Sequence, residues 1–251
     1  MFWTKLHLIT LIPTLIIMVI IGIILRKVLR DKSLKIRMIP FKIFAILLII
    51  GEIIKQYLSI KGGYNLFNLP LHVCSMFLLF IPLMAFYKGK YSNTINSITV
   101  TLCTLLTICM LIMPNQIYGY NSIKDYFNDY FCFHTVTFHN IVVFELILIL
   151  FLDLYNKEQF TKYKNIFIFG CCYVLIASTA AQLLKTNYSN FYYCQIPALQ
   201  KILDYITSYC GNLLGKIIHI IIVGSTQLFG FTFSYIMAKR IILLKNKLTT
   251  H

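Results

Sequence analysis

The chain has 251 residues, of which 59% are hydrophobic and only 12% are charged, yet its formal net charge is +15. Soluble globular domains carry about 25% charged residues because their surfaces face water, so this composition excludes an ordinary soluble enzyme. Apolar runs recur along the whole length, and about 20 such residues are what a helix needs to cross the ~30 Å hydrocarbon core of a bilayer. We therefore expect an all-α membrane protein.

Seven apolar segments qualify as membrane-spanning helices of a single integral domain that covers residues 1–251. In chain order they are residues 6–25, 41–60, 69–87, 95–113, 134–154, 163–184 and 213–238. The strands of a membrane barrel would instead form segments of about 10 residues with alternating polarity, and the sequence shows no such pattern. The sequence predicts a polytopic bundle of about seven helices.

Positive charge follows the first apolar segment rather than preceding it, which distinguishes this segment from a secretory signal. Seven basic residues lie between Arg26 and Lys42, which predicts a retained anchor with the N-terminus outside and the C-terminus in the cytoplasm. With seven spans, sixteen of the 23 Lys and Arg residues fall on the cytoplasmic side, while Lys55 lies near a span end and reaches the interface.

This topology accounts for the excess positive charge without a nucleic-acid partner. No zinc-finger, helix-turn-helix or RNA-binding motif accompanies the basic segments. We therefore expect membrane lipids, and no nucleic acid, as partners.

Polar side chains inside the spans carry most of the functional information, because they are costly in hydrocarbon and usually mark a site. A rise of ~1.5 Å per residue places seven of them ~3–12 Å below the outer end of their helices, beneath the two long outer loops. They are Glu52, Gln56, His72, Cys74, His139, Gln182 and His219. We take His72, Cys74 and His139 as candidate catalytic residues and the other four as candidate substrate-binding residues.

The segment 68–75, Asn-Leu-Pro-Leu-His-Val-Cys-Ser, opens the third span. Its asparagine is a good N-cap and its proline fits a first turn, so we expect the third helix to begin here. In a helix, a separation of two residues is a rotation of about 200° about the axis, so His72 and Cys74 would point to different sides. A Cys–His pair therefore needs His139 or His219 from another helix. A lone cysteine in a span also serves as a small hydrophobic residue.

The motif Leu-Pro-Leu-His-x-Cys at the start of a span, together with His139 and the seven-span outline, resembles the YwaF family of bacterial integral membrane proteins. That family is similar to eukaryotic multi-spanning phospholipid acyltransferases, in which an intramembrane Cys and His act on acyl chains. The resemblance implies a multi-pass protein of the bacterial cell membrane and maps His72 and His139 onto histidines of the eukaryotic motif. The eukaryotic nucleophile directly precedes the first histidine, where this chain has Leu71. Cys74, one helical turn further, would stand in for it.

The first functional hypothesis is an intramembrane lipid acyltransferase or lipid hydrolase at the outer leaflet. Cys74 would attack an acyl ester and His139 would act as general base, without a cofactor. The alternatives are a small-ligand transporter that uses the polar belt between helices and a non-catalytic membrane protein. Transporters usually contain paired repeats and broken helices, and the sequence shows neither.

Three further features leave alternatives open. His72, His139 and His219 could supply three zinc ligands, but Glu52 is the one evident carboxylate to support them, so we expect no metal.

Glu145, near mid-membrane, fits either a strut bonded to another helix or a proton relay. A bridge between Cys194 and Cys210 would close the last outer loop.

Overall fold

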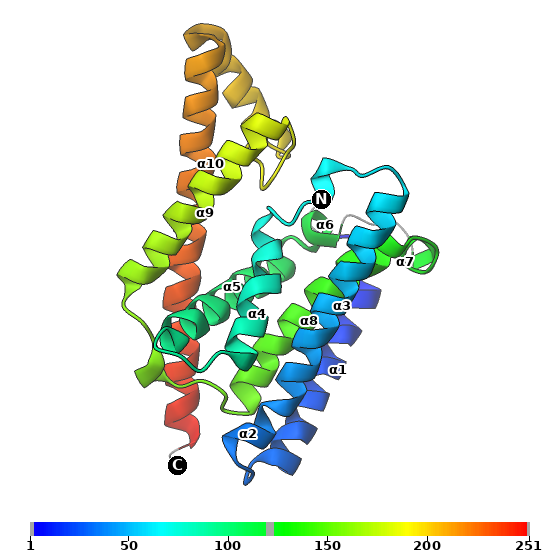
Figure 1. Cartoon of the computed structure of the whole chain (residues 1–251), viewed down its shortest axis with the longest axis vertical. Helices are drawn as coiled ribbons and strands as arrows, with labels where there is room; N and C mark the ends of the chain where they lie inside the picture. Colours follow the sequence, from blue (N-terminus) through cyan, green and yellow to red (C-terminus); the bar gives the residue numbers. More distant parts are fainter. Residues whose placement is uncertain (1–2, 119–122, 250–251) are drawn as a thin grey trace.

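The computed structural model describes residues 3–118 and 123–249, and the secondary structure within these ranges is entirely helical. The expectation of an all-α protein is confirmed. The elements are α1 Lys5–Leu29, α2 Leu34–Arg37, α3 Ile39–Lys61, η1 Leu66–Asn68, η2 Val73–Met76, α4 Phe77–Phe86, α5 Ser92–Ile112, α6 Pro114–Tyr118, α7 Ile123–Asn128, α8 Tyr130–Phe151, η3 Lys157–Gln159, α9 Tyr163–Leu184 and α10 Pro197–Thr249 (Figure 1).

Five helices in the described part of the chain are long and apolar enough to cross a membrane: α1, α5, α8, α9 and α10. The α3 helix is 23 residues long but includes charged residues such as Lys42, Glu52 and Lys55. The η2–α4 segment, Val73–Phe86, is apolar but short. A multi-pass membrane protein is therefore confirmed, whereas the count of seven spans stays a prediction.

The α5 helix lies between the two halves of the bundle (Figure 1). On one side it packs against α4 and α8, which in turn contact α3 and α1, and on the other side it packs against α9 and α10. Its buried threonines donate to backbone carbonyls four residues earlier, as Thr101 does to Ser97 (2.7 Å) and Thr104 to Val100 (2.8 Å). Because these hydroxyls are satisfied within the helix, α5 can be buried on several sides.

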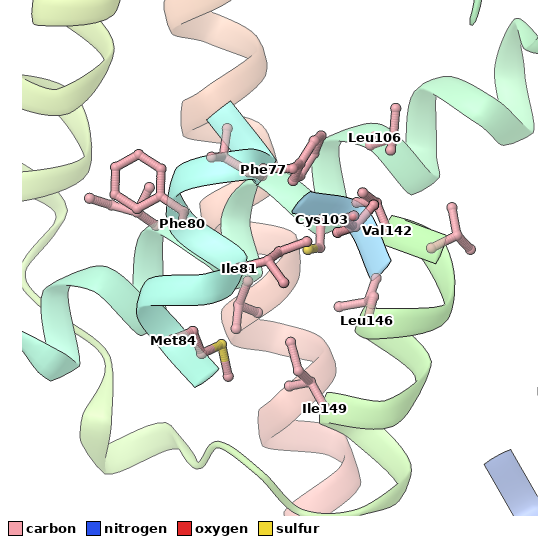
Figure 2. Close-up of a cluster of buried hydrophobic side chains, with 14 of the residues drawn as sticks. Phe77, Phe80, Ile81, Met84, Cys103, Leu106, Val142, Leu146 and Ile149 are labelled. Atoms are coloured by element: carbon pink, nitrogen blue, oxygen red, sulfur yellow. The ribbon is translucent and has the colours of Figure 1, made fainter. Parts of the chain in front are cut away.

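The apolar core lies where α4, α5 and α8 meet, and Figure 2 shows its side chains converging from the three helices. Hydrocarbon gives little hydrophobic drive between helices, so close packing holds such a core together. Its labelled members are Phe77, Phe80, Ile81 and Met84 of α4, Cys103 and Leu106 of α5, and Val142, Leu146 and Ile149 of α8.

Gly211 divides α10 into two arms, residues 197–210 and 212–249. Its φ of 81° and ψ of 163° are non-helical, and glycine adopts a positive φ without steric cost. The chain turns back at this point, at the top of Figure 1. The seven-span prediction makes residues 185–212 an outer segment, and the structure forms a helical arm within it, residues 197–210. Cys194 is buried and Cys210 exposed, and both are free thiols.

The two ends of the bundle differ in charge. The basic segments that follow α1, α4 and η3 lie at the end that holds the C-terminus (Figure 1). There Arg37 donates to the carbonyl of Leu152 (2.8 Å), and Lys245 pairs with Asp153. Residues 62–72 and 185–196 lie toward the other end (Figure 1). This separation is the one that a positive-inside topology needs, and the orientation itself stays a prediction.

Close contact between α9 and α10 depends on Gly170. A Cβ there would lie 2.8 Å from Leu228 Cδ2 and 3.0 Å from Phe231 Cδ2, whereas a Cβ at Gly230 would meet Leu105 Cδ1 at an ordinary 3.5 Å. We expect Gly170→Ala to be less stable than Gly230→Ala by about 1 kcal/mol, because only the first overpacks the contact. Thermal unfolding in detergent compares the two variants, which share the same gain in helix propensity. Equal midpoints would contradict this account.

Candidate functional site

The chain between α3 and α4 is unwound at its approach to the site. Leu69 (φ −60°, ψ 140°) and His72 (φ −74°, ψ 155°) are extended, and helix resumes only at Val73. The prediction that the third helix begins at Asn68 is therefore wrong. Pro70 gives the physical reason, because a proline disfavours the helical region for the residue before it.

Side chains from other elements satisfy the backbone of this unwound segment. These bonds give its backbone groups partners within the protein. They run from Gln56 Nε2 to the Asn68 carbonyl (2.7 Å), from the Tyr188 hydroxyl to the Leu66 carbonyl (2.6 Å), from the Tyr173 hydroxyl to the Leu71 carbonyl (3.2 Å), and from the Val73 amide to Ser189 Oγ (3.0 Å).

A cavity of about 490 Å³ lies between this segment, α3, α6, α8 and the 187–195 loop. Four of the predicted site residues line it: Glu52, His72, Cys74 and His139. We had expected helical geometry to keep His72 and Cys74 on different faces. They line one cavity because His72 lies in extended backbone and Cys74 in a 3₁₀ turn.

His139 has the geometry of a general base. Its Nδ1 lies 2.6 Å from the carbonyl oxygen of Thr135, one turn earlier on α8. A carbonyl only accepts, so Nδ1 carries the proton and Nε2 keeps its lone pair. The residue is only 7% exposed, so this tautomer is held in a largely dry wall of the cavity.

His72 is held between two aromatic rings. Its ring centroid lies 4.6 Å from that of Phe67 and 5.4 Å from that of Tyr188, both in edge-to-face geometry. Its Nε2 donates to the Phe67 carbonyl at 3.3 Å, which leaves Nδ1 as an acceptor. His72 therefore accepts rather than donates a hydrogen bond at its other ring nitrogen.

A polar cluster around Glu52 lies on the α3 side, in which Glu52 and Lys55 line the cavity and the predicted site residue Gln56 does not. Lys55 Nζ lies 2.9 Å from Glu52 Oε1, and Gln56 Nε2 donates to the same oxygen at 2.6 Å. His134 Nε2 lies 3.4 Å from Glu52 Oε2, which is long for a hydrogen bond. The side chains of Glu52 and Lys55 are only 12% and 16% exposed, so this ion pair is largely shielded from solvent.

The sequence did not point to Lys55 and His134 as site residues, although both line the cavity. We had placed Lys55 at the interface and treated His134 as the first residue of a span. The i,i+3 spacing from Glu52 to Lys55 was a usable signal, because residues so spaced share a helix face. No comparable signal joined His134 to α3, which is distant in sequence.

Tyr64 closes the cluster from the loop after α3. Its hydroxyl donates to Gln56 Oε1 at 2.8 Å. Burial, and secondly the Glu52 carboxylate, raise the pKa of Tyr64 above its usual value. The phenol therefore stays a proton donor, and it orients the Gln56 amide so that its NH₂ group faces Glu52.

Gln182 and His219 do not line this cavity. Gln182 Nε2 donates to the Phe191 carbonyl (2.8 Å), and His219 Nε2 donates to the Asn190 carbonyl (2.7 Å). Both bonds hold the loop whose Asn187, Ser189 and Asn190 do line the cavity. The structure places these two predicted residues behind the wall and brings them to the site only through that loop.

Ser189 is the centre of that loop. Besides accepting from the Val73 amide, its Oγ lies 2.6 Å from the Tyr173 hydroxyl, and its carbonyl accepts from Gln227 (2.8 Å). Its φ of 49° and the φ of 69° at Asn190 are left-handed. Such backbone is uncommon outside glycine and persists where surrounding contacts enforce it, as these bonds do.

Two alternatives from the sequence concern metal and Glu145. Within residues 3–118 and 123–249, no three His, Cys, Asp or Glu side chains are grouped so that they could hold a metal, and His219 is bonded elsewhere. Glu145 is fully buried on α8, ~9 Å further along the helix than His139, and in the described structure neither carboxyl oxygen has a hydrogen-bond partner. It lies outside the cavity lining.

Comparison with known proteins assigns the chain to a family. The model of the TMEM164 family matches residues 2–237, which is nearly the whole length. This match corrects the YwaF resemblance, which rested on a six-residue motif and on an outline of spans that many membrane proteins share. No curated protein and no solved structure matches the chain significantly.

The ion pair on α3 can be tested by a double-mutant cycle with Glu52→Gln and Lys55→Met. We expect each single variant to lower the unfolding free energy by about 3 kcal/mol, because each leaves one shielded charge unpaired. The double variant should lose less than the sum of the two, since it leaves neither charge. Thermal unfolding in detergent measures this, and additive losses would contradict direct pairing.

Proposed function

This chain belongs to the TMEM164 family of membrane proteins, and we propose that it is an intramembrane enzyme that transfers or hydrolyses phospholipid acyl chains. The observation that carries the proposal is the cavity that Cys74 and His139 both line, together with the His139 Nε2 that the bond from Nδ1 to Thr135 leaves unprotonated. A thiol beside such an imidazole is the pairing that nucleophilic acyl chemistry needs.

We propose that Cys74 Sγ attacks the ester carbonyl while its proton passes to His139 Nε2. Collapse of the tetrahedral intermediate breaks the bond to the glycerol oxygen, which takes that proton and leaves as a lysophospholipid alcohol. The acyl group then remains as a thioester on Cys74. A second alcohol, or water, bonds to the thioester carbonyl as its proton passes to His139, and the departing thiolate takes the proton back.

Lys55 is the candidate donor for the negative charge that develops on the carbonyl oxygen. Its ammonium lines the same cavity, and the Glu52 carboxylate fixes its position at 2.9 Å. A preorganised cation in a site shielded from water stabilises an oxyanion more strongly than water does. In this assignment Glu52 and Gln56 are positioning residues, because they act through Lys55 and the unwound segment.

Lipid chemistry is favoured over transport by what lies next to the cavity. The α4 and α8 helices continue from the cavity directly into the packed core of Figure 2, with residues such as Phe77, Ile81 and Val142 fully or nearly fully buried. A transporter needs a polar path on the far side of its binding site. An apolar floor instead suits a site that receives a lipid ester from one side.

We also propose the seven-span topology, with the N-terminus outside and the C-terminus inside. In it, α3 and the η2–α4 segment join the five candidate spans. The α3 helix has polar side chains and the η2–α4 segment has only 14 residues. Both elements are compatible with membrane depth because each contacts the cavity rather than only lipid. The basic segments gathered at one end support this orientation.

Substitution of the two reacting groups tests the enzyme. We expect Cys74→Ala and His139→Ala to lower the rate of acyl transfer or hydrolysis by at least 10²-fold, the usual contribution of a general base. Cys109→Ala is the matched control, because Cys109 lies on α5 outside the cavity lining. The measurement is product formation from phosphatidylcholine in proteoliposomes, with and without a lysophospholipid acceptor.

The proposed thioester gives a second, independent readout. Intact-protein mass spectrometry of the wild type after brief exposure to substrate should show a mass increase of one acyl group that hydroxylamine removes, and Cys74→Ala should not show it. Full activity of either the Cys74 or the His139 variant would rule out the assignment.

A further inference from the structure

A second hollow in the molecule lies on the flank where α1 and α7 pack against α8. It has a volume of about 630 Å³ and a mostly apolar lining. On α1 the lining extends from Ile9 to Ile21, and on α8 from Val136 to Phe144. We call it the α1–α8 groove.

The position of this groove points to a lipid chain as its occupant. Both α1 and α8 are candidate membrane spans, and the outer face of α1 exposes large aliphatic side chains such as Ile16 and Ile17. Ile9 and Ile21 are twelve residues apart, or ~18 Å along the helix. One leaflet accounts for about half of a ~30 Å hydrocarbon core, so the groove follows the depth of a single leaflet.

The few polar groups in the groove wall are already bonded within the protein. Thr10 Oγ1 donates to the Leu6 carbonyl (2.8 Å), and Thr14 Oγ1 donates to the Thr10 carbonyl (2.8 Å). The Tyr118 hydroxyl donates to Asn140 Oδ1 at 2.7 Å. The groove therefore presents mainly methyl groups and ring faces, which suits a hydrocarbon chain better than a polar ligand.

One residue belongs to both hollows. Tyr118 lines the groove and also lines the polar cavity, and it is only 4% exposed. Its ring stacks on that of His7 at 5.9 Å, which fixes it between α1 and α8. The apolar groove and the polar cavity thus adjoin at Tyr118, which is the arrangement that binding the two parts of one amphipathic molecule requires.

We propose that the α1–α8 groove binds the acyl chain of the phospholipid whose ester enters the polar cavity. This inference rests on the proposed function for the identity of the substrate. The groove thereby sets the acyl-chain length that the enzyme accepts, with Ile21 at its deep end.

The test compares Ile21→Trp with Ile20→Trp. Both replace a half-exposed isoleucine of α1, 41% and 49% exposed, but only Ile21 lines the groove. Filling the deep end should shift the preference of Ile21→Trp toward shorter chains, with a loss of about fourfold for each methylene that no longer fits. Ile20→Trp should keep the wild-type chain-length profile in phosphatidylcholine vesicles of defined chain length. Equal profiles for both variants would overturn the proposal.

A binding readout separates this inference from the catalytic proposal. The probe is a phosphatidylcholine vesicle in which one lipid in twenty has a diazirine at the end of its sn-2 chain. Photolabelling should concentrate on the groove segments of α1 and α8 relative to Leu175 and Ile176, which are exposed on α9. Ile21→Trp should lose this enrichment, whereas Ile20→Trp and the catalytic variant His139→Ala should keep it.

Each outcome decides one of the two ideas. Labelling enriched in the groove of a protein that forms no acyl product supports the groove and overturns the proposed function. Labelling spread equally over the groove and α9 overturns the groove, whatever the activity. Crosslinks between the α1 helices of two protein molecules, without lipid labelling of the groove, also overturn it, since a second copy would then be the occupant.

Discussion

The structure depends on one requirement: a backbone that leaves the helical conformation where it is shielded from water must find its hydrogen-bond partners within the protein. Pro70 prevents the chain from continuing as helix before His72, so the carbonyls of Asn68 and Leu71 lose helical partners, whereas the Leu66 carbonyl accepts from the Leu69 amide at 3.1 Å. Gln56, Tyr173 and Tyr188 bond to them from α3, α9 and the following loop. The same bonds draw these elements around the space that becomes the polar cavity, so the cavity is a consequence of satisfying the unwound segment.

Height along each helix was predictable from the sequence, because a helix advances by ~1.5 Å per residue. That rule brought Glu52, His72, Cys74 and His139 to one level, where the structure gives them a common cavity. Which neighbouring element a side chain faces was not predictable, because the sequence does not show how the helices pack around one another. Gln182 and His219 bond to loop carbonyls instead of lining the cavity, and His134 lies 3.4 Å from Glu52 although the sequence placed it at the start of a span. The start of the third helix was missed because Pro70 was taken as a first-turn residue, whereas its restriction of Leu69 dominates.

The polar and apolar halves of the molecule stabilise each other. Glu52 and Lys55 place charge in a largely shielded wall, but as a pair they add no net charge, and a paired ion costs far less to bury than an isolated one. The core between α4, α5 and α8 holds the helices that bear His139 and Cys74 in fixed register. The proposed reaction needs its thiol and imidazole fixed to within a fraction of an ångström, and rigid packing next to the cavity favours that precision. The groove beside α1, in contrast, is bounded by a helix that contacts the remainder of the bundle chiefly along α8.

The gathering of basic segments at one end, with the cavity toward the other, has a consequence for the bilayer as a whole. To invert the molecule, more than a dozen cations would have to cross hydrocarbon, so its orientation is permanent once it has been inserted. The proposed acyl chemistry would then act on the lipids of one monolayer and leave the other untouched. Removing or adding acyl chains on a single side changes the area of that monolayer alone. The imbalance has to be relieved by bending of the membrane or by movement of lipids between its two sides.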